Sequence, residues 1–194
     1  MNNRADSVRV AHPLFQTDRG GSTPTSALQL QIVELDRYVA RDLNALWHSR
    51  LPVYSTGFCL NATAAYGAMF EGIYYASAIW TNPVAQALPQ HEWLELRRFA
   101  IGPDAPKYTA SRMLAVMVRL IRKKLPHVVN LISYQDVEAH QGTIYKAAGW
   151  IATTKHSGGS WNRPNSTNKS NGKPRTRPNL NEATGPKIRW EKKL

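Results

Sequence analysis

The feature that most constrains the fold of this chain is the order of its apolar segments between residues 28 and 153. In residues 28–33 apolar and polar side chains alternate, which predicts a half-buried strand. Asp36 then offers an N-cap for a helix that runs to about Trp47. The ordered part of the chain is therefore expected to begin with one strand and one helix.

Three further strands are expected between residues 55 and 101. Segments 55–63 and 72–81 are rich in aromatic and aliphatic residues, and we expect them to pair as an antiparallel hairpin. The turn between them is predicted to centre on Tyr66-Gly67. A third strand is predicted over residues 92–101, after which a stretch with glycine and two prolines breaks the backbone.

The rest of the chain alternates helices and strands. The clearest helical pattern covers residues 111–125, begins at Thr109 or Ser111, and has apolar side chains along one side. A buried strand at 128–133, a short helix at 142–148 and a strand from 150 follow. In the last seven residues Ile188 and Trp190 alternate with basic neighbours, which predicts a terminal strand that joins the tail to the sheet.

This order predicts an α/β (α+β) fold with a mixed central sheet and helices on both faces. Its topology matches the acyltransferase fold of the GNAT superfamily, so we expect a GNAT-like domain over residues 27–156. A topological match indicates a fold and not a chemistry. Residues 1–26 are polar and aperiodic and are expected to form a mobile arm. Residues 157–194 are expected to add a basic loop and the terminal strand to the same domain.

The charge of the chain indicates the class of its partner. Lys and Arg number 25 against 13 Asp and Glu, a net charge of +12, which indicates a polyanion and first of all nucleic acid. Residues 152–194 hold ten of the basic residues but only two acidic ones. The residues expected to contact double-stranded DNA are Lys169, Lys173, Arg175, Arg177, Lys187 and Arg189. A solubilising tail is the alternative.

Membranes and cysteine chemistry are not expected. No segment approaches the roughly eighteen apolar residues of a membrane span, and the first residues lack the apolar region of a signal peptide. The single cysteine excludes an internal disulfide framework and a cysteine-based zinc site. We expect a cytoplasmic protein without membrane contact.

Two clusters of polar residues lie near the first helix and the third strand of the middle group. His48 is expected at the C-terminal end of its helix, either as a cap of the helix carbonyls or as a functional group. Two-residue alternation places Arg98 on the same face of its strand as Leu96, the face of the apolar side chains. A lone arginine there needs an anion or a carboxylate.

A third cluster surrounds the start of the long helix. Lys107, Ser111 and Arg112 lie where free backbone N–H groups suit a phosphate or carboxylate, so they are candidates for cofactor binding. An ordinary Ser or Thr N-cap is the alternative. GNAT enzymes that use acetyl-CoA carry a glycine-rich pyrophosphate loop here. This chain has one glycine, Gly102, followed by prolines that lack N–H groups, which speaks against acetyl-CoA.

The fourth and densest polar cluster follows the buried strand. Asp136 stands where that strand ends, the usual place for a functional residue in a sheet with helical crossovers, and His140 and Tyr145 follow. Nitrogen and oxygen donors of these types suit a hard or borderline metal such as iron. We therefore predict iron bound by some of His48, Asp136, His140 and Tyr145, with a hydrogen-bonded loop as the alternative.

Five motifs along residues 28–152 resemble the Mom family of bacteriophage DNA-modification proteins. They are Glu95-Leu96-Arg97-Arg98, Asp104-Ala105-Pro106-Lys107, Ser111-Arg112, Ser133-Tyr134-Gln135-Asp136 and the segment from His140 to Trp150. The resemblance implies a GNAT-like fold and a phage-encoded enzyme of the host cytoplasm that converts adenine in DNA to N6-carbamoylmethyladenine, which blocks restriction enzymes. It also implies iron rather than acetyl-CoA. Carried over by motif, the functional residues are His48, Arg98, Ser111, Asp136 and Tyr145.

The leading hypothesis is therefore an enzyme that transfers a carbamoylmethyl-type group to N6 of a flipped adenine. Arg98 and Ser111 would position the donor, and Asp136 would act as base or as acceptor for the N6 amine. Tyr145 and His48 would serve as metal or general-acid residues. The alternatives are a GNAT-like acetyl-CoA-dependent N-acetyltransferase and a basic DNA-binding protein without activity. The group donor, the DNA target motif and a homodimer are left open.

Overall fold

The computed structural model describes residues 23–48, 61–160 and 183–194. The helices are η1 (Ala27–Gln29, a 3-10 helix), α1 (Arg37–Trp47), α3 (Thr109–Lys124) and α4 (Thr143–Ala147). The strands are β1 (Gln31–Glu34), β2 (Ala62–Phe70), β3 (Ile73–Thr81), β4 (Trp93–Ile101), β5 (Asn130–Asp136), β6 (Ile151–His156), β7 (Gly159–Ser160), β8 (Ala183–Thr184) and β9 (Lys187–Lys193).

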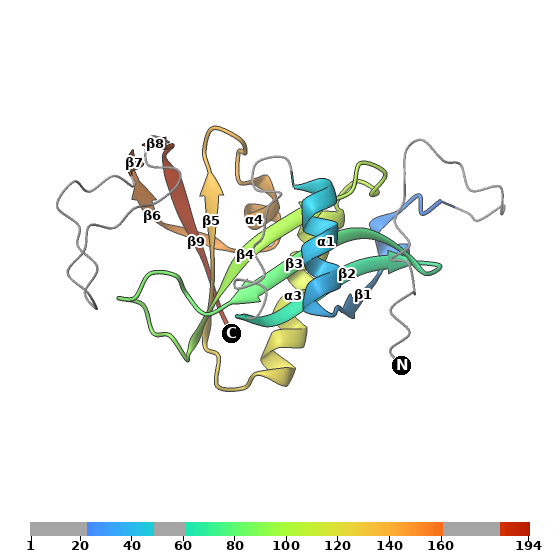
Figure 1. Cartoon of the computed structure of the whole chain (residues 1–194), viewed down its shortest axis with the longest axis horizontal. Coiled ribbons are helices and arrows are strands. Elements are labelled where there is room, and N and C mark those ends of the chain that lie inside the picture. Colours follow the sequence, from blue (N-terminus) through green and yellow to red (C-terminus); the bar gives the residue numbers. More distant parts are fainter. Residues whose placement is uncertain (1–22, 49–60, 161–182) are drawn as a thin grey trace.

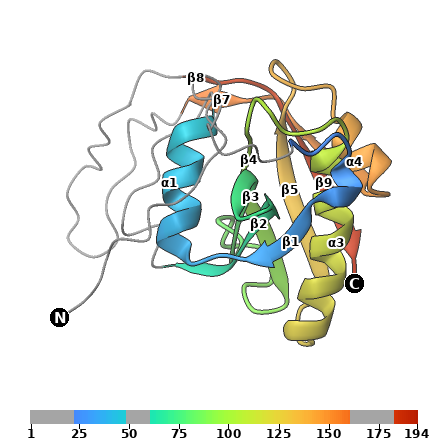
Figure 2. The same ribbon diagram turned by 90° about the vertical axis from the view of Figure 1, so that its right-hand side faces the viewer.

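The described elements form a mixed sheet between two layers of helix. Seven strands lie in the order β1-β2-β3-β4-β5-β9-β6, and β7 pairs separately with β8. Only the β4–β5 pair is parallel among these described strands. Helix α1 covers one face of the sheet, whereas α3 and α4 lie on the other (Figures 1 and 2). The predicted mixed sheet with helices on both faces is confirmed.

The first strand starts later than the alternation predicted. Ser26 and Gln29 form a capping box, in which Ser26 Oγ accepts from the Leu28 N–H and Gln29 Oε1 accepts from the Ser26 N–H. This box closes η1 and leaves Leu28 79% exposed. The predicted N-cap of α1 is confirmed, because Asp36 Oδ1 accepts from the Tyr38 N–H at 2.8 Å.

The hairpin of β2 and β3 turns at Glu71-Gly72, so the predicted turn at Tyr66-Gly67 is wrong. Both turn residues have positive φ, 48° and 79°, as a two-residue hairpin turn requires. Gly67 instead lies inside β2, where a Cβ would come within 2.9 Å of Leu35 Cδ1. That glycine allows close packing and does not form a turn.

A β-bulge in β4 changes which side chains share a face. Trp80 pairs with Leu96 and Ile79 with Arg98, so Arg97 is the extra residue of the bulge. Neighbouring residues on β3 point to opposite faces, and cross-strand partners point to the same face. Leu96 and Arg98 therefore lie on opposite faces. The prediction that they share one is wrong, because simple alternation does not survive a bulge.

Helix α3 begins at Thr109, one of the two predicted starts, but the alternative of an ordinary Ser or Thr N-cap is wrong. The N-cap is Tyr108, which has φ 70° and makes no side-chain capping hydrogen bond. The hydroxyl of Thr109 donates to the Pro106 carbonyl at 2.6 Å, and that of Ser111 donates to the Tyr108 carbonyl at 3.1 Å. The last apolar residues of α3 and their basic neighbours follow the predicted pattern up to Lys124.

The C-terminal strand lies inside the sheet. Strand β9 runs antiparallel to both β5 and β6 and separates them. The predicted terminal strand is thereby confirmed, as is the short helix, which appears as α4. Strand β5 begins at Asn130, later than predicted, and extends to Asp136.

The main core lies between the sheet and α3, with Trp80, Met113, Leu114, Met117 and Leu131 among its fully buried members. A smaller cluster of Ala40, Ala65 and Ile79 holds α1 on the opposite face. Within the described ranges, no helix is long and apolar enough to cross a membrane. Of the mobile arm predicted over residues 1–26, residues 1–22 lie outside the described residues, and Ser26 caps η1.

Candidate active site

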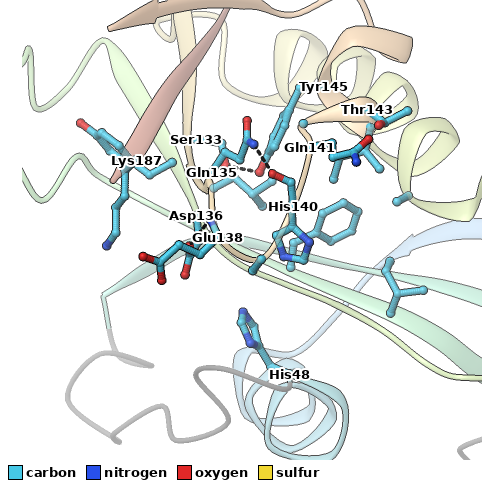
Figure 3. A pocket seen from close by; sticks show the side chains of 18 of the residues that line it. His48, Ser133, Gln135, Asp136, Glu138, His140, Gln141, Thr143, Tyr145 and Lys187 are labelled. Carbon is cyan, nitrogen blue, oxygen red and sulfur yellow. Dashed lines mark hydrogen bonds between the residues drawn. The ribbon is translucent and has the colours of Figure 1, made fainter. Parts of the chain in front are cut away.

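A cavity opens where β4 and β5 part. The two strands pair from Trp93–Asn130 to Leu96–Ser133, although β4 continues to Ile101 and β5 to Asp136. The cavity measures about 740 Å³. Its lining comes from β4, β5, α4, the β5–α4 loop and the C-terminal end of α1, so both faces of the sheet contribute (Figure 3).

His48 reaches the cavity from the C-terminal end of α1. The sequence predicted this position at the end of the helix. It is the C-cap of the helix, and its own N–H donates to the Asn44 carbonyl at 2.9 Å. Burial, the positive charge of Arg98 and the nearby His140 all lower the pKa of the His48 imidazole below 6.5. The imidazole is therefore neutral at pH 7 and able to accept a proton.

Arg98 lies near His48 but is not among the residues that line the described cavity. Its Nη1 donates to the Arg97 carbonyl at 2.8 Å. The side chain acts on His48 through charge, and its face of β4 is the one covered by α1.

Arg97 lines the cavity in its place, although the sequence pattern did not predict this. Its Nη1 donates to Oε1 of Glu95 at 3.0 Å, and Glu95 as a residue is 2% exposed. The second carboxylate oxygen of Glu95 accepts from the Val84 N–H at 2.9 Å. A buried carboxylate therefore fixes a guanidinium at the wall of the cavity. The cluster of charged residues in β4 indicated a functional site. The bulge that places Arg97 in the cavity wall depends on the register with β3, which the sequence of β4 alone does not contain.

Asp136 stands at the end of β5 and lines the cavity. Its Oδ1 accepts from the Glu138 N–H at 3.1 Å, and its carbonyl accepts from the N–H groups of Ala139 and His140. These bonds fold the chain after β5 into a loop that also brings Glu138 and His140 to the cavity (Figure 3). Asp136, His140 and His48 are thus brought to one site.

Tyr145 reaches the same cavity from α4, but its hydroxyl is already engaged. The residue is 7% exposed, and its hydroxyl shares a 2.8 Å hydrogen bond with Ser133 Oγ. Its ring stacks on Trp190, with centroids 5.3 Å apart and planes 15° apart. Burial raises the pKa of the Tyr145 hydroxyl, so the group stays protonated.

The predicted cofactor-binding residues lie beside the cavity rather than in its lining. Ala110 at the start of α3 contributes to the wall, whereas Lys107, Ser111 and Arg112 do not appear in the described lining. In the loop before α3, the Gly102 N–H donates to the carbonyl of Tyr75 on β3, and the Ala105 N–H donates to the Gly102 carbonyl.

The predicted iron ligands do not form a ligand shell in the described residues. No group of three or more His, Cys, Asp or Glu side chains there is placed to hold a metal ion. The Tyr145 hydroxyl is bonded to Ser133 instead. Iron at this site stays a prediction.

Of the predicted DNA contacts, only those on β9 can be placed. Lys187 lines the cavity and lies opposite Asp136 in the register. Arg189 pairs with Glu191 at 2.8 Å. Lys169, Lys173, Arg175 and Arg177 lie outside the described residues.

The sequence model of the Mom protein family matches residues 30–191, which include all the cavity residues named above. The chain belongs to the Mom protein family. No curated protein sequence matches the chain. For this Mom protein, the match confirms the resemblance that the five motifs indicated.

Solved structures show which fold this Mom protein shares. An IAA acetyltransferase from Bacillus cereus is 12% identical with a TM-score of 0.57, over 85% of this chain and 99% of that one. A GNAT family acetyltransferase from Elizabethkingia anophelis with acetyl-CoA bound is 15% identical with a TM-score of 0.54, over 86% and 99%. A GNAT family acetyltransferase from Streptococcus pneumoniae is 12% identical with a TM-score of 0.54, over 85% and 99%. The predicted GNAT-like fold is confirmed.

Proposed function

We propose that this chain is a phage DNA-modification enzyme that converts adenine in double-stranded DNA to N6-carbamoylmethyladenine and so protects phage DNA from host restriction. The observation that supports this most is that the cavity between β4 and β5 lies wholly within the residues matched by the Mom family. A volume of about 740 Å³ suits a flipped purine together with a small donor.

The residues at the cavity suit the removal of a proton from an amine. In the reaction, N6 of adenine forms a bond to the methylene carbon of an activated carbamoylmethyl donor, the bond from that carbon to its leaving group breaks, and N6 loses a proton. Asp136 would accept a hydrogen bond from the N6 amine, and the neutral imidazole of His48 would take the proton. Arg97 would face the polar end of the donor.

The other predicted residues take indirect parts in this proposal. After burial, the charge of Arg98 also lowers the pKa of His48 and so favours its neutral form. Ser111 at the start of α3 would help to orient the donor beside Ala110, and Tyr145 would offer a protonated hydroxyl from the buried wall. No step of the proposal is assigned to a metal.

Iron bound by some of His48, Asp136, His140 and Tyr145 remains part of the proposal and has its own test. Elemental analysis of protein purified without chelators should find iron. Zinc in stoichiometric amount, or no metal, would contradict it and leave an acid–base site.

Mass spectrometry of nucleosides from cells that express the chain tests the main proposal. The wild-type chain should produce N6-carbamoylmethyladenine. Each of the variants Arg98→Ala, Asp136→Asn and Tyr145→Phe should abolish this product, while DNA binding and the melting temperature change little. A drop of many degrees in melting temperature would mean that the residue is structural. Unchanged DNA with salt-sensitive binding would favour a DNA-binding protein, and calorimetric binding of acetyl-CoA would favour an N-acetyltransferase.

A further inference from the structure

A buried glutamine connects the C-terminal strand to the loop that carries His140. Gln135 lies on β5 and is 3% exposed. Its Oε1 accepts from the indole N–H of Trp190 on β9 at 2.7 Å. Its Nε2 donates to the His140 carbonyl, a bond drawn in Figure 3. Both ends of one side-chain amide are thus used, one toward the core and one toward the wall of the cavity.

The loop gains little stability from burial of its own side chains. Residues 137–141 are all exposed, whereas Gly142, which follows, is buried. At Gly142 a Cβ would lie 2.5 Å from Gln135 Oε1 and 2.6 Å from Trp190 Cζ2. The loop therefore ends pressed directly against the Gln135–Trp190 pair, and Tyr145 stacks on Trp190 one turn later.

We infer that Gln135 and Trp190 are positioning residues, which hold the β5–α4 loop so that His140 faces His48 across the cavity. The inference rests on the proposed function for its effect on activity. Neither residue has to touch the DNA: Trp190 orients the amide of Gln135, and that amide fixes the backbone at His140. A small displacement of groups around a reacting centre lowers the rate far more than it lowers stability.

Three variants separate the two hydrogen bonds. Gln135→Met keeps the side chain's size but removes both bonds. Gln135→Glu keeps an acceptor for the Trp190 N–H but loses the donor to His140. Trp190→Phe keeps an aromatic ring against Tyr145 but loses the indole donor. We expect each variant to lower adenine modification by about tenfold to a hundredfold, with binding to double-stranded DNA unchanged.

Asn130→Leu supplies the matched control. Asn130 is also a buried amide of β5 that bonds to β9, through its Nδ2 and Glu191 Oε2 at 3.1 Å. It lies five residues before Gln135, about 16 Å away along the strand. This variant should lower the melting temperature by an amount similar to Gln135→Met but leave modification near the wild-type rate. If Asn130→Leu and Gln135→Met lose adenine modification equally, in proportion to their fall in melting temperature, the inference is overturned.

NMR keeps the inference testable apart from activity. In the Gln135 variants the ring signals of His140 should shift, and in Asn130→Leu they should stay in place. In the wild-type chain the side-chain amide protons of Gln135 should exchange slowly with solvent, because the amide is buried and hydrogen-bonded. Unmoved His140 signals or a rapidly exchanging amide would refute the inference. A wild-type chain that makes no modified adenine would refute the proposed function instead.

Discussion

Gly142 offers a direct measurement of how tightly the cavity loop is packed. Replacing it with alanine adds one methyl group at φ 71°, with Gln135 Oε1 at 2.5 Å and Trp190 Cζ2 at 2.6 Å. The left-handed backbone alone costs about 1–2 kcal/mol for a residue with a Cβ. Overpacking against two buried, hydrogen-bonded side chains adds about 1–3 kcal/mol. We therefore expect Gly142→Ala to lower the free energy of unfolding by about 2–5 kcal/mol.

Gly72→Ala isolates the backbone part of this cost. Gly72 has φ 79° in the β2–β3 turn, and no heavy atom of the described chain lies within 4 Å of a Cβ built there. This variant should lose only about 1–2 kcal/mol. Urea unfolding of both variants measures the difference between their free energies of unfolding, provided that their m-values are equal. If Gly142→Ala loses no more than Gly72→Ala, the loop is not pressed against Gln135 and Trp190.

Three further results are expected. Glu95→Gln should lower the free energy of unfolding by about 1–3 kcal/mol in urea, because Arg97 loses its buried counter-charge; an unchanged midpoint would mean that the pair is not formed. The folded-state pKa of His48 lies below 6.5, so the unfolded chain binds that proton more tightly. Stability should be full above about pH 6.5 and fall as pH drops below it, and His48→Asn should lack that part of the fall; identical pH profiles would contradict this. Finally, if about five basic residues neutralise phosphates, log K should fall with log salt at a slope of roughly −4 to −5. Neutralising Lys169, Lys173, Arg175 and Arg177 together should reduce that slope by about three, and an unchanged slope would make the segment a solubilising tail.

Elements with local signals were predictable from the sequence. The Asp36 cap, the end of α1 at Trp47 and the short helix α4 depend on residues a few positions apart, and each was found where expected. Tertiary contacts decided the failures. Gly67 and Gly72 look alike in the sequence, but Leu35 packs against the first and the second turns the hairpin.

The candidate site was predictable where one element sufficed to place a residue. Asp136 at the end of a buried strand and His48 at the end of a helix both line the cavity. Arg97 was missed because the register with β3 decides which arginine the bulge turns toward the cavity. The bond between Gln135 and Trp190 joins residues 55 positions apart, a distance that no local pattern spans.

The position of β9 between β5 and β6 also determines when this half of the sheet can form during synthesis. Strands β5 and β6 both pair with β9, and β9 is translated after them. In a nascent chain whose residues 187–193 have not yet left the ribosome, the edges of β5 and β6 that face β9 are unpaired, and Gln135 lacks its hydrogen bond from Trp190. This half of the sheet therefore completes its strand pairing only after residues 187–193 have left the ribosome.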